Sequence, residues 1–269
     1  YQSYSFSFTE PWLGGKKPLG LSASISHSKQ FLYNWYTYDV DKSQSFNITT
    51  LSLGLSKRLT VPDDYFMLSQ VVSYQYFDLN NYNTGLFTFG DGQANNLAYT
   101  VALSRNSKGH NPIFPTTGSE FTVSGKFTPP YSLFDGVNYK TLADQEEYKV
   151  VTKQNTTTTN GQYVPAGTYL DANGNPVANN DYRLAAVDQG KLDQRRFKML
   201  EYYKLKFKGE WYSSITKIGN QPLVLRTLGE FGFMGAYNND RGLVPFERFY
   251  VGGDGMANFT MDGREIVQL

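Results

Sequence analysis

Side chains alternate between apolar and small polar types with a period of two, and this pattern constrains the fold more than any other feature. In the first segment, Tyr4, Phe6 and Phe8 alternate with serines. Such alternation is typical of a β-strand with one apolar and one polar face. It recurs in residues 1–9, 19–26, 51–56, 65–79, 96–104, 121–128, 203–211 and 223–233. The sequence therefore predicts an all-β chain built on about eight antiparallel strands.

The connections between these segments favour a transmembrane barrel over a soluble sandwich. We expect short turns after the first, third, fifth and seventh strands, and long loops after the others. Residues 30–47 are the predicted link after the second strand, and residues 129–198 are a predicted extracellular excursion without a second core. Short turns at one rim and long loops at the other are typical of antiparallel transmembrane β-barrels.

Charge and composition agree with a barrel wall. Aromatic residues make up 16% of the chain, while charged residues make up only 18%. A lipid-facing apolar side and a water-filled lumen would satisfy both the aromatic side chains and the charges that stand opposite them in mid-strand. The predicted lumen charges are Lys204, Lys206, Lys208, Arg226 and Glu230. The alternative is an edge strand with a solvated charged face.

Motifs of enzymes and cofactor sites are weak or missing in this sequence. The chain has no cysteine and only two histidines, His27 and His110, which lie far apart. Residues 171–175 resemble a calcium loop, but the glycine falls at the wrong position and Tyr182 replaces the bidentate glutamate. No serine lies in a nucleophile elbow. We therefore expect no enzyme activity, no cofactor and no metal, and the net charge of +1 gives no signature of nucleic-acid binding.

Three connections resemble one family, that of the outer-membrane assembly factor BamA and its Omp85 relatives. Glu10-Pro11-Trp12 resembles a periplasmic turn, and residues 114–119 (FPTTGS) are similar to a second turn of the family. Residues 245–253 (PFERFYVGG) resemble the entry to the family's sixth extracellular loop. The resemblance implies that residues 1–269 supply strands four to eleven of a barrel of about sixteen strands. The periplasmic POTRA repeats and the strands of the seam would then lie outside this sequence.

The resemblance also implies a loop that folds back into the lumen. Residues 238–269 would begin this sixth loop, and the lumen charges would help to hold it. Its expected root consists of Phe249, Gly252, Gly253, Asp254, Gly255, Asp262 and Arg264. The glycines would allow close backbone packing in a crowded lumen.

The function that the resemblance implies is insertion and folding of β-barrel proteins into the bacterial outer membrane without ATP. A weakly paired seam strand would template each incoming strand. The expected partners are the client β-barrel proteins, accessory lipoproteins, possible surface-exposed subunits and the lipid bilayer. Two alternatives stay open: a channel or two-partner secretion pore of the same superfamily, and a secreted glycan-binding β-protein.

Overall fold

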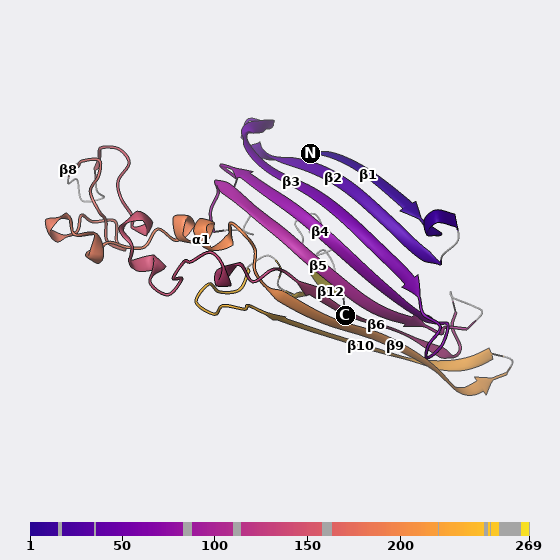
Figure 1. Ribbon diagram of the computed structural model, residues 1–269. Helices are drawn as coiled ribbons and strands as arrows, with labels where there is room; N and C mark the ends of the chain where they lie inside the picture. The colour runs from indigo at the N-terminus through magenta and orange to yellow at the C-terminus, as the bar shows by residue number, and fades with distance from the viewer. Residues whose placement is uncertain are drawn as a thin grey trace.

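An eight-stranded antiparallel sheet forms most of the chain, with strands in the order β1-β2-β3-β4-β5-β6-β9-β10 (Figure 1). The computed structural model describes residues 1–15, 18–34, 36–82, 88–109, 114–157, 163–219, 221–244, 247, 249–252 and 265–268. The strands are β1 (Gln2–Glu10), β2 (Leu19–Asn34), β3 (Asp39–Arg58), β4 (Phe66–Asn80), β5 (Gly92–Asn106), β6 (Gly118–Phe127), β9 (Tyr203–Ile218) and β10 (Gln221–Gly235). The prediction of an all-β chain with eight antiparallel strands is confirmed. The sheet is open among the described residues, with β1 and β10 as its edges.

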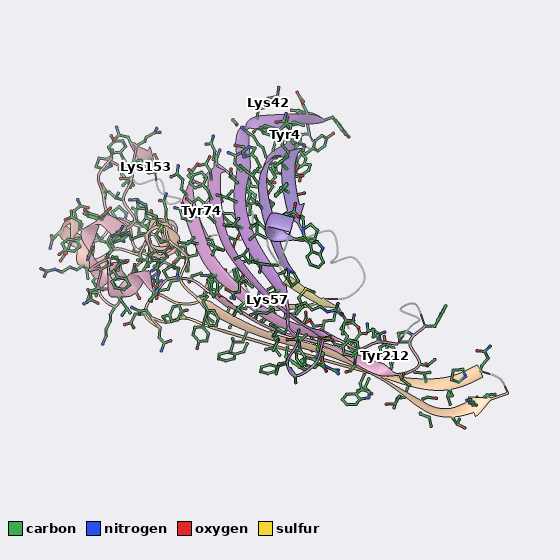
Figure 2. All side chains as sticks on the ribbon, turned by 45° about the vertical axis from the view of Figure 1, so that its right-hand side comes forward. Tyr4, Lys42, Lys57, Tyr74, Lys153 and Tyr212 are labelled. Atoms are coloured by element: carbon green, nitrogen blue, oxygen red, sulfur yellow. The ribbon has the colours of Figure 1, made fainter. Side chains whose placement is uncertain are left out.

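One face of this curved sheet, the apolar face, carries large hydrophobic side chains that no other described segment covers (Figure 2). The strand register places them opposite one another, as in the pairs Phe6–Ile25 and Phe207–Phe231. Phe6 is 68% exposed and Phe231 is 62% exposed. Other members of the apolar face are Tyr4, Phe8, Leu51, Leu53, Val72, Tyr74, Tyr99, Val123, Leu205, Leu225 and Phe233. An uncovered apolar surface that crosses a whole sheet fits a face in contact with lipid and not with water.

The opposite side of the sheet is the polar face, and it carries serines on β1–β3 and charges on β6, β9 and β10. The Ser24 and Ser52 hydroxyls lie 2.7 Å apart across β2 and β3. Towards one rim this face becomes apolar and is covered by other parts of the chain. The resulting buried cluster contains Phe46, Phe77, Leu79, Tyr82, Phe89, Ala94, Phe197, Leu200, Tyr202 and Val244. The sequence did not predict this cluster, because its members come from five separate segments.

Two predicted connections differ from those observed. The expected long link over residues 30–47 is wrong: β2 and β3 stay paired to Asn34 and Asp39, past a bulge at Phe31/Leu32. Phe31, Leu32 and Tyr33 are consecutive and point to both faces, so the alternation is lost while the backbone pairing continues. Residues 107–117, expected as a short turn, span as much chain as residues 81–91 at the other rim. We call the rim with residues 59–65, 107–109 and 114–117 the short-turn rim, and the opposite one the excursion rim.

The excursion joins β6 to β9 and extends from one end of the sheet, while the β9–β10 turn lies at the opposite end (Figure 1). It contains α1 (Gln189–Phe197), the strands β7 (Thr156–Thr157) and β8 (Tyr163–Val164), and the 3-10 helices η2 (Tyr131–Leu133), η3 (Leu142–Asp144), η4 (Glu146–Tyr148), η5 (Ala178–Asn180) and η6 (Tyr182–Leu184). One more 3-10 helix, η1 (Leu13–Gly15), follows β1. In the described part of the chain, no helix has the length and apolar character needed to cross a membrane.

The expectation that the excursion lacks a core is wrong. Tyr139, Leu142, Tyr148 and Leu192 form a small buried cluster of their own, with Val137, Ala143 and Val187 packed against it. Leu142 and Tyr148 belong to the single-turn helices η3 and η4, Leu192 to α1, and Tyr139 to the irregular chain before η3, so these apolar positions share no period. A period-based reading of the sequence therefore could not detect this cluster.

Candidate functional site

The chain that follows β10 runs along the polar face, and Glu247 fixes it there. Its side chain is 6% exposed, and its carboxylate accepts hydrogen bonds from Lys126 Nζ at 2.8 Å and from the Tyr202 hydroxyl at 2.9 Å. Lys204 Nζ lies 3.6 Å from the second carboxylate oxygen, and Asn96 Nδ2 lies 3.5 Å from the first. We call these five residues the Glu247 cluster. Its two lysines come from the neighbouring strands β6 and β9, where Lys126 and Lys204 are paired in register.

Burial makes the charge balance of this cluster important. Lys204 is 5% exposed, so its ammonium group has lost most of its water. A buried cation needs a paired anion, and Glu247 supplies a negative charge 3.6 Å away. The cluster therefore favours one position of the segment after β10, on the polar face next to the excursion rim.

Phe249, the first residue of β11 (Phe249–Gly252), extends the contact further along the same face. Its ring lies under the Lys204 ammonium, which is 4.3 Å from the ring centroid. The ring also covers Gly232 of β10, where an added Cβ would stand 2.7 Å from ring atoms. A larger residue at position 232 would therefore displace the aromatic ring. β11 pairs in parallel with β12 (Glu265–Gln268).

We expect Gly232→Val to destabilise the protein by about 1–3 kcal/mol, because the added methyl groups overpack against the Phe249 ring. Gly229→Val is the matched control on the same strand, since a Cβ there meets nothing within 4 Å. Urea unfolding of the refolded protein in detergent micelles measures both variants. Equal unfolding free energies for the two would show that the Phe249 ring does not occupy this position.

Arg241 forms a second buried attachment of the same segment. Its guanidinium donates to Glu201 Oε2 at 3.0 Å and to the Arg196 carbonyl at 2.7 Å, and it also donates to the Met199 carbonyl. Glu201 accepts two further hydrogen bonds, both 2.7 Å long, from the backbone N–H and the hydroxyl of Ser132. The Arg241–Glu201 pair thus joins the chain after β10 to both ends of the excursion.

Tyr139 lies below the guanidinium, with its ring centroid 5.1 Å from Arg241 Cζ. Burial raises the pKa of Tyr139 to about 12, helped by the hydrogen bond that its hydroxyl donates to Asp135. The ring is therefore neutral at physiological pH, and it can take part in a cation–π contact with Arg241.

A comparison with known protein families identifies the fold to which this wall belongs. The model of the Omp85 superfamily domain matches residues 1–181 and 185–260. The chain belongs to the Omp85 superfamily. A crystal structure of BamA from Haemophilus ducreyi lacking POTRA domains 1-3 is similar at 15% identity and a TM-score of 0.49, over 94% of this chain and 36% of that chain. The present chain thus spans well under half of that structure. Curated proteins gave no match.

In this Omp85 chain, the predicted lumen charges all lie on the polar face, but they have different partners. Lys204 belongs to the Glu247 cluster. Lys206 pairs with Glu230 at 3.2 Å, and Arg226 pairs with Glu210 at 2.9 Å, nearer the short-turn rim. Lys208 is exposed and lies opposite Glu230 in the strand register. Arg226 and Glu230 therefore bind the neighbouring strand β9, and the described contacts of the segment after β10 come from other residues.

The predicted root of the sixth loop is described only in part. Phe249 contacts Lys204 and Gly232, and Gly252 ends β11. Gly253, Asp254, Gly255, Asp262 and Arg264 lie outside the described residues. Their assignment to the loop root remains a prediction.

The sequence analysis gave no role to Lys126, Glu201, Arg241 or Glu247. Two signals were available. Lys126 is a charged residue within the alternating pattern of β6, and Glu247 is an acidic residue inside a motif rich in aromatic residues. Among the residues that the structure describes, no group of three or more histidine, aspartate or glutamate side chains could hold a metal ion.

Proposed function

We propose that this chain forms one wall of an outer-membrane barrel that inserts and folds other β-barrel proteins. Membership of the Omp85 superfamily supports the broader role in outer-membrane protein insertion or secretion. The observation that favours insertion is the segment after β10, which is attached to the polar face by Glu247 and Arg241. A lumen that contains an attached protein segment is less suited to be an open channel.

The energetic basis of insertion is the unpaired edge of a strand in lipid. Each unsatisfied backbone N–H or C=O in hydrocarbon costs several kcal/mol, so a client strand gains by pairing at an open seam. The present wall would lie away from that seam. Its continuous antiparallel register, with shifts only at Phe31/Leu32 and Leu223/Val224 among the described strands, suits a part that stays rigid while the seam opens.

The expected partners follow from this role and remain proposals. Client β-barrel proteins would reach the seam, and accessory lipoproteins would attach to parts of the complex beyond this wall. The excursion is the proposed contact for surface-exposed subunits, because it carries the exposed apolar residues Leu133, Phe134 and Leu184. The extensive uncovered apolar face argues against the alternative of a secreted glycan-binding protein, which would have to keep that face in water.

The test is reconstitution of the full-length protein into liposomes together with an unfolded client barrel. We expect faster folding of the client, seen as heat-modifiable migration on gels, than in liposomes that hold an unrelated barrel of similar size. No acceleration, combined with steady conductance in planar bilayers, would instead support the channel or secretion-pore alternative.

A further inference from the structure

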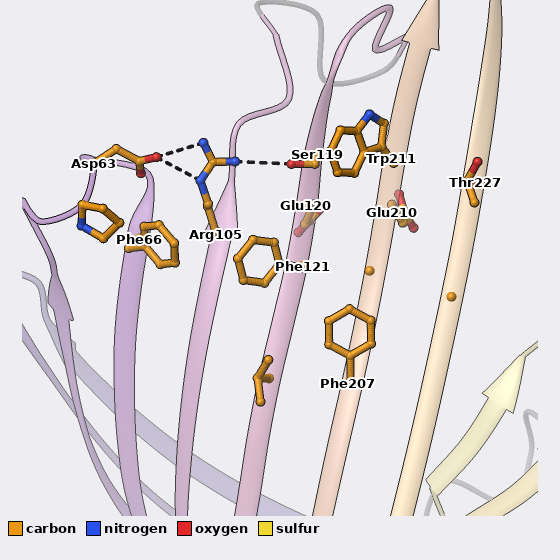
Figure 3. A pocket seen from close by; sticks show the side chains of 14 residues that line it. Asp63, Phe66, Arg105, Ser119, Glu120, Phe121, Phe207, Glu210, Trp211 and Thr227 are labelled. Atoms are coloured by element: carbon orange, nitrogen blue, oxygen red, sulfur yellow. Dashed lines mark hydrogen bonds and ion pairs between the residues drawn. The ribbon is translucent and has the colours of Figure 1, made fainter.

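The apolar face contains a groove of about 680 Å³ close to the short-turn rim (Figure 3). It lies across β4, β5, β6, β9 and β10 and lies away from the Glu247 cluster, which is at the excursion rim. Its apolar lining consists of Pro62, Phe66, Phe121, Val123, Phe207 and Trp211. A volume of this size is within the range of roughly 300–1,000 Å³ that is common for small-molecule sites.

The groove is deepest at Gly229, which is paired with a second glycine of the neighbouring strand. Gly209 of β9 lies opposite Gly229 of β10, and the alternation places both on the apolar face. The Phe207 ring packs over Gly209, where an added Cβ would stand 3.0 Å from a ring atom, and Trp211 follows two residues later. A Cβ at position 229 would meet nothing within 4 Å, which shows that the hollow there is open.

An ion pair closes the end of the groove at the rim. Arg105 Nε and one terminal nitrogen donate to Asp63 Oδ2 at 3.0 and 2.9 Å, and the other terminal nitrogen donates to Ser107 and Ser119. The Arg105 and Asp63 side chains are 24% and 34% exposed. The rim therefore presents both signs of charge beside an apolar hollow. Trp211, 64% exposed, lies at the same end, where aromatic residues of membrane proteins meet the interface.

We propose that this groove is a binding site for one zwitterionic glycerophospholipid of the adjacent leaflet. One acyl chain would lie over Gly229 beside the Phe207 ring, and the head group would reach the Arg105–Asp63 pair. A lipid is the occupant that the position favours, because the groove opens on the face that contacts the bilayer. An empty hollow there would also lose dispersion contacts on its lining. The inference rests on the membrane-barrel part of the proposed function and not on insertion activity.

The experiment uses the full-length protein in detergent micelles, with every tryptophan other than Trp211 replaced by phenylalanine. Phosphatidylethanolamine brominated on its acyl chains quenches the fluorescence of Trp211. The control reporter is Leu53→Trp in a Trp211→Phe background, at another place on the apolar face. Its quenching measures contact with lipid where there is no binding site. We expect half-maximal quenching of Trp211 at a lipid-to-detergent ratio about fivefold lower than for the Leu53→Trp reporter, a clear affinity difference. Brominated phosphatidylglycerol should quench Trp211 less than the zwitterionic lipid.

Two variants locate the effect in the groove. Gly229→Leu fills the hollow and should bring the quenching of Trp211 to the level of the Leu53→Trp reporter, while Gly229→Ala should leave it near the parent value. Equal quenching of both reporters in the parent protein, or no change in Gly229→Leu, would show ordinary annular lipid and overturn the site. Equal quenching by the two head groups would overturn the role of the Arg105–Asp63 pair. Client assembly is not measured here, so this test and the test of function fail independently.

Discussion

Replacing Arg241 by methionine should lower the free energy of unfolding by about 3–5 kcal/mol, the usual loss when one partner of a buried ion pair is removed. The Arg241 and Glu201 side chains are 3% and 1% exposed, and their charged atoms are 3.0 Å apart. Without Arg241, Glu201 would keep only its hydrogen bonds from Ser132 to offset a buried negative charge. Urea unfolding of the refolded protein in detergent micelles, followed by tryptophan fluorescence, measures the loss.

Two controls show whether the loss of stability in Arg241→Met comes from the burial of the ion pair or from the removal of any arginine. Arg226→Met removes a 55% exposed guanidinium from its pair with Glu210 and should cost no more than about 1 kcal/mol. The double variant Arg241→Met/Glu201→Met leaves no unpaired charge and should recover part of the stability lost in Arg241→Met alone. Similar small losses for Arg241→Met and Arg226→Met would mean that the Arg241–Glu201 pair does not hold the segment after β10.

Glu247→Gln should release the segment after β10 from the polar face. The substitution keeps the size of the side chain but removes the carboxylate charge that lies beside Lys126 and the buried Lys204. Val244→Cys is a suitable reporter, because Val244 is 1% exposed and the chain has no cysteine of its own. We expect thiol labelling of this reporter to become at least about tenfold faster, which corresponds to a loss of about 1.4 kcal/mol in docking. Client assembly should slow in parallel.

Glu230→Gln is the matched control for Glu247→Gln. Glu230 also lies on the polar face and is 12% exposed, but its partner is Lys206 of the neighbouring strand. Labelling of the Val244→Cys reporter should stay at the parent rate in this variant. Slow labelling in Glu247→Gln, with heat-modifiable migration intact, would contradict the role assigned to the Glu247 cluster.

The strands could be predicted from the sequence because the residues of each strand alternate between types suited to its apolar face and types suited to its polar face. Tyr4, Phe6 and Phe8 face one side and the intervening serines the other, and no distant information is needed to read this. The ends of β2 and β3 were missed for the same reason, because their pairing continues where Phe31, Leu32 and Tyr33 break the alternation. Backbone hydrogen bonds do not depend on side-chain pattern, so alternation alone cannot show where a hairpin ends.

The candidate site was predictable in its chemistry but not in its pairing. Charged residues within the strand pattern, such as Lys204, predicted a polar face on which these charges help to hold another segment of the chain. The partner, Glu247, lies in a segment after β10, and only the folded chain brings the two together. Arg241 and Glu201 are both charged residues in irregular segments, where the sequence carries no period to indicate burial. Long-range ion pairs of this kind are set by tertiary packing.

The attachment of the excursion has a consequence for how this wall can change in evolution. The Thr128 N–H donates to the Tyr202 carbonyl at 3.1 Å, so the excursion leaves and re-enters the sheet at one point. Beyond it, β6 and β9 pair as direct neighbours, as if a tight turn joined them. Selection can therefore lengthen, shorten or replace the surface module between these two residues while the strand register of the wall is inherited unchanged.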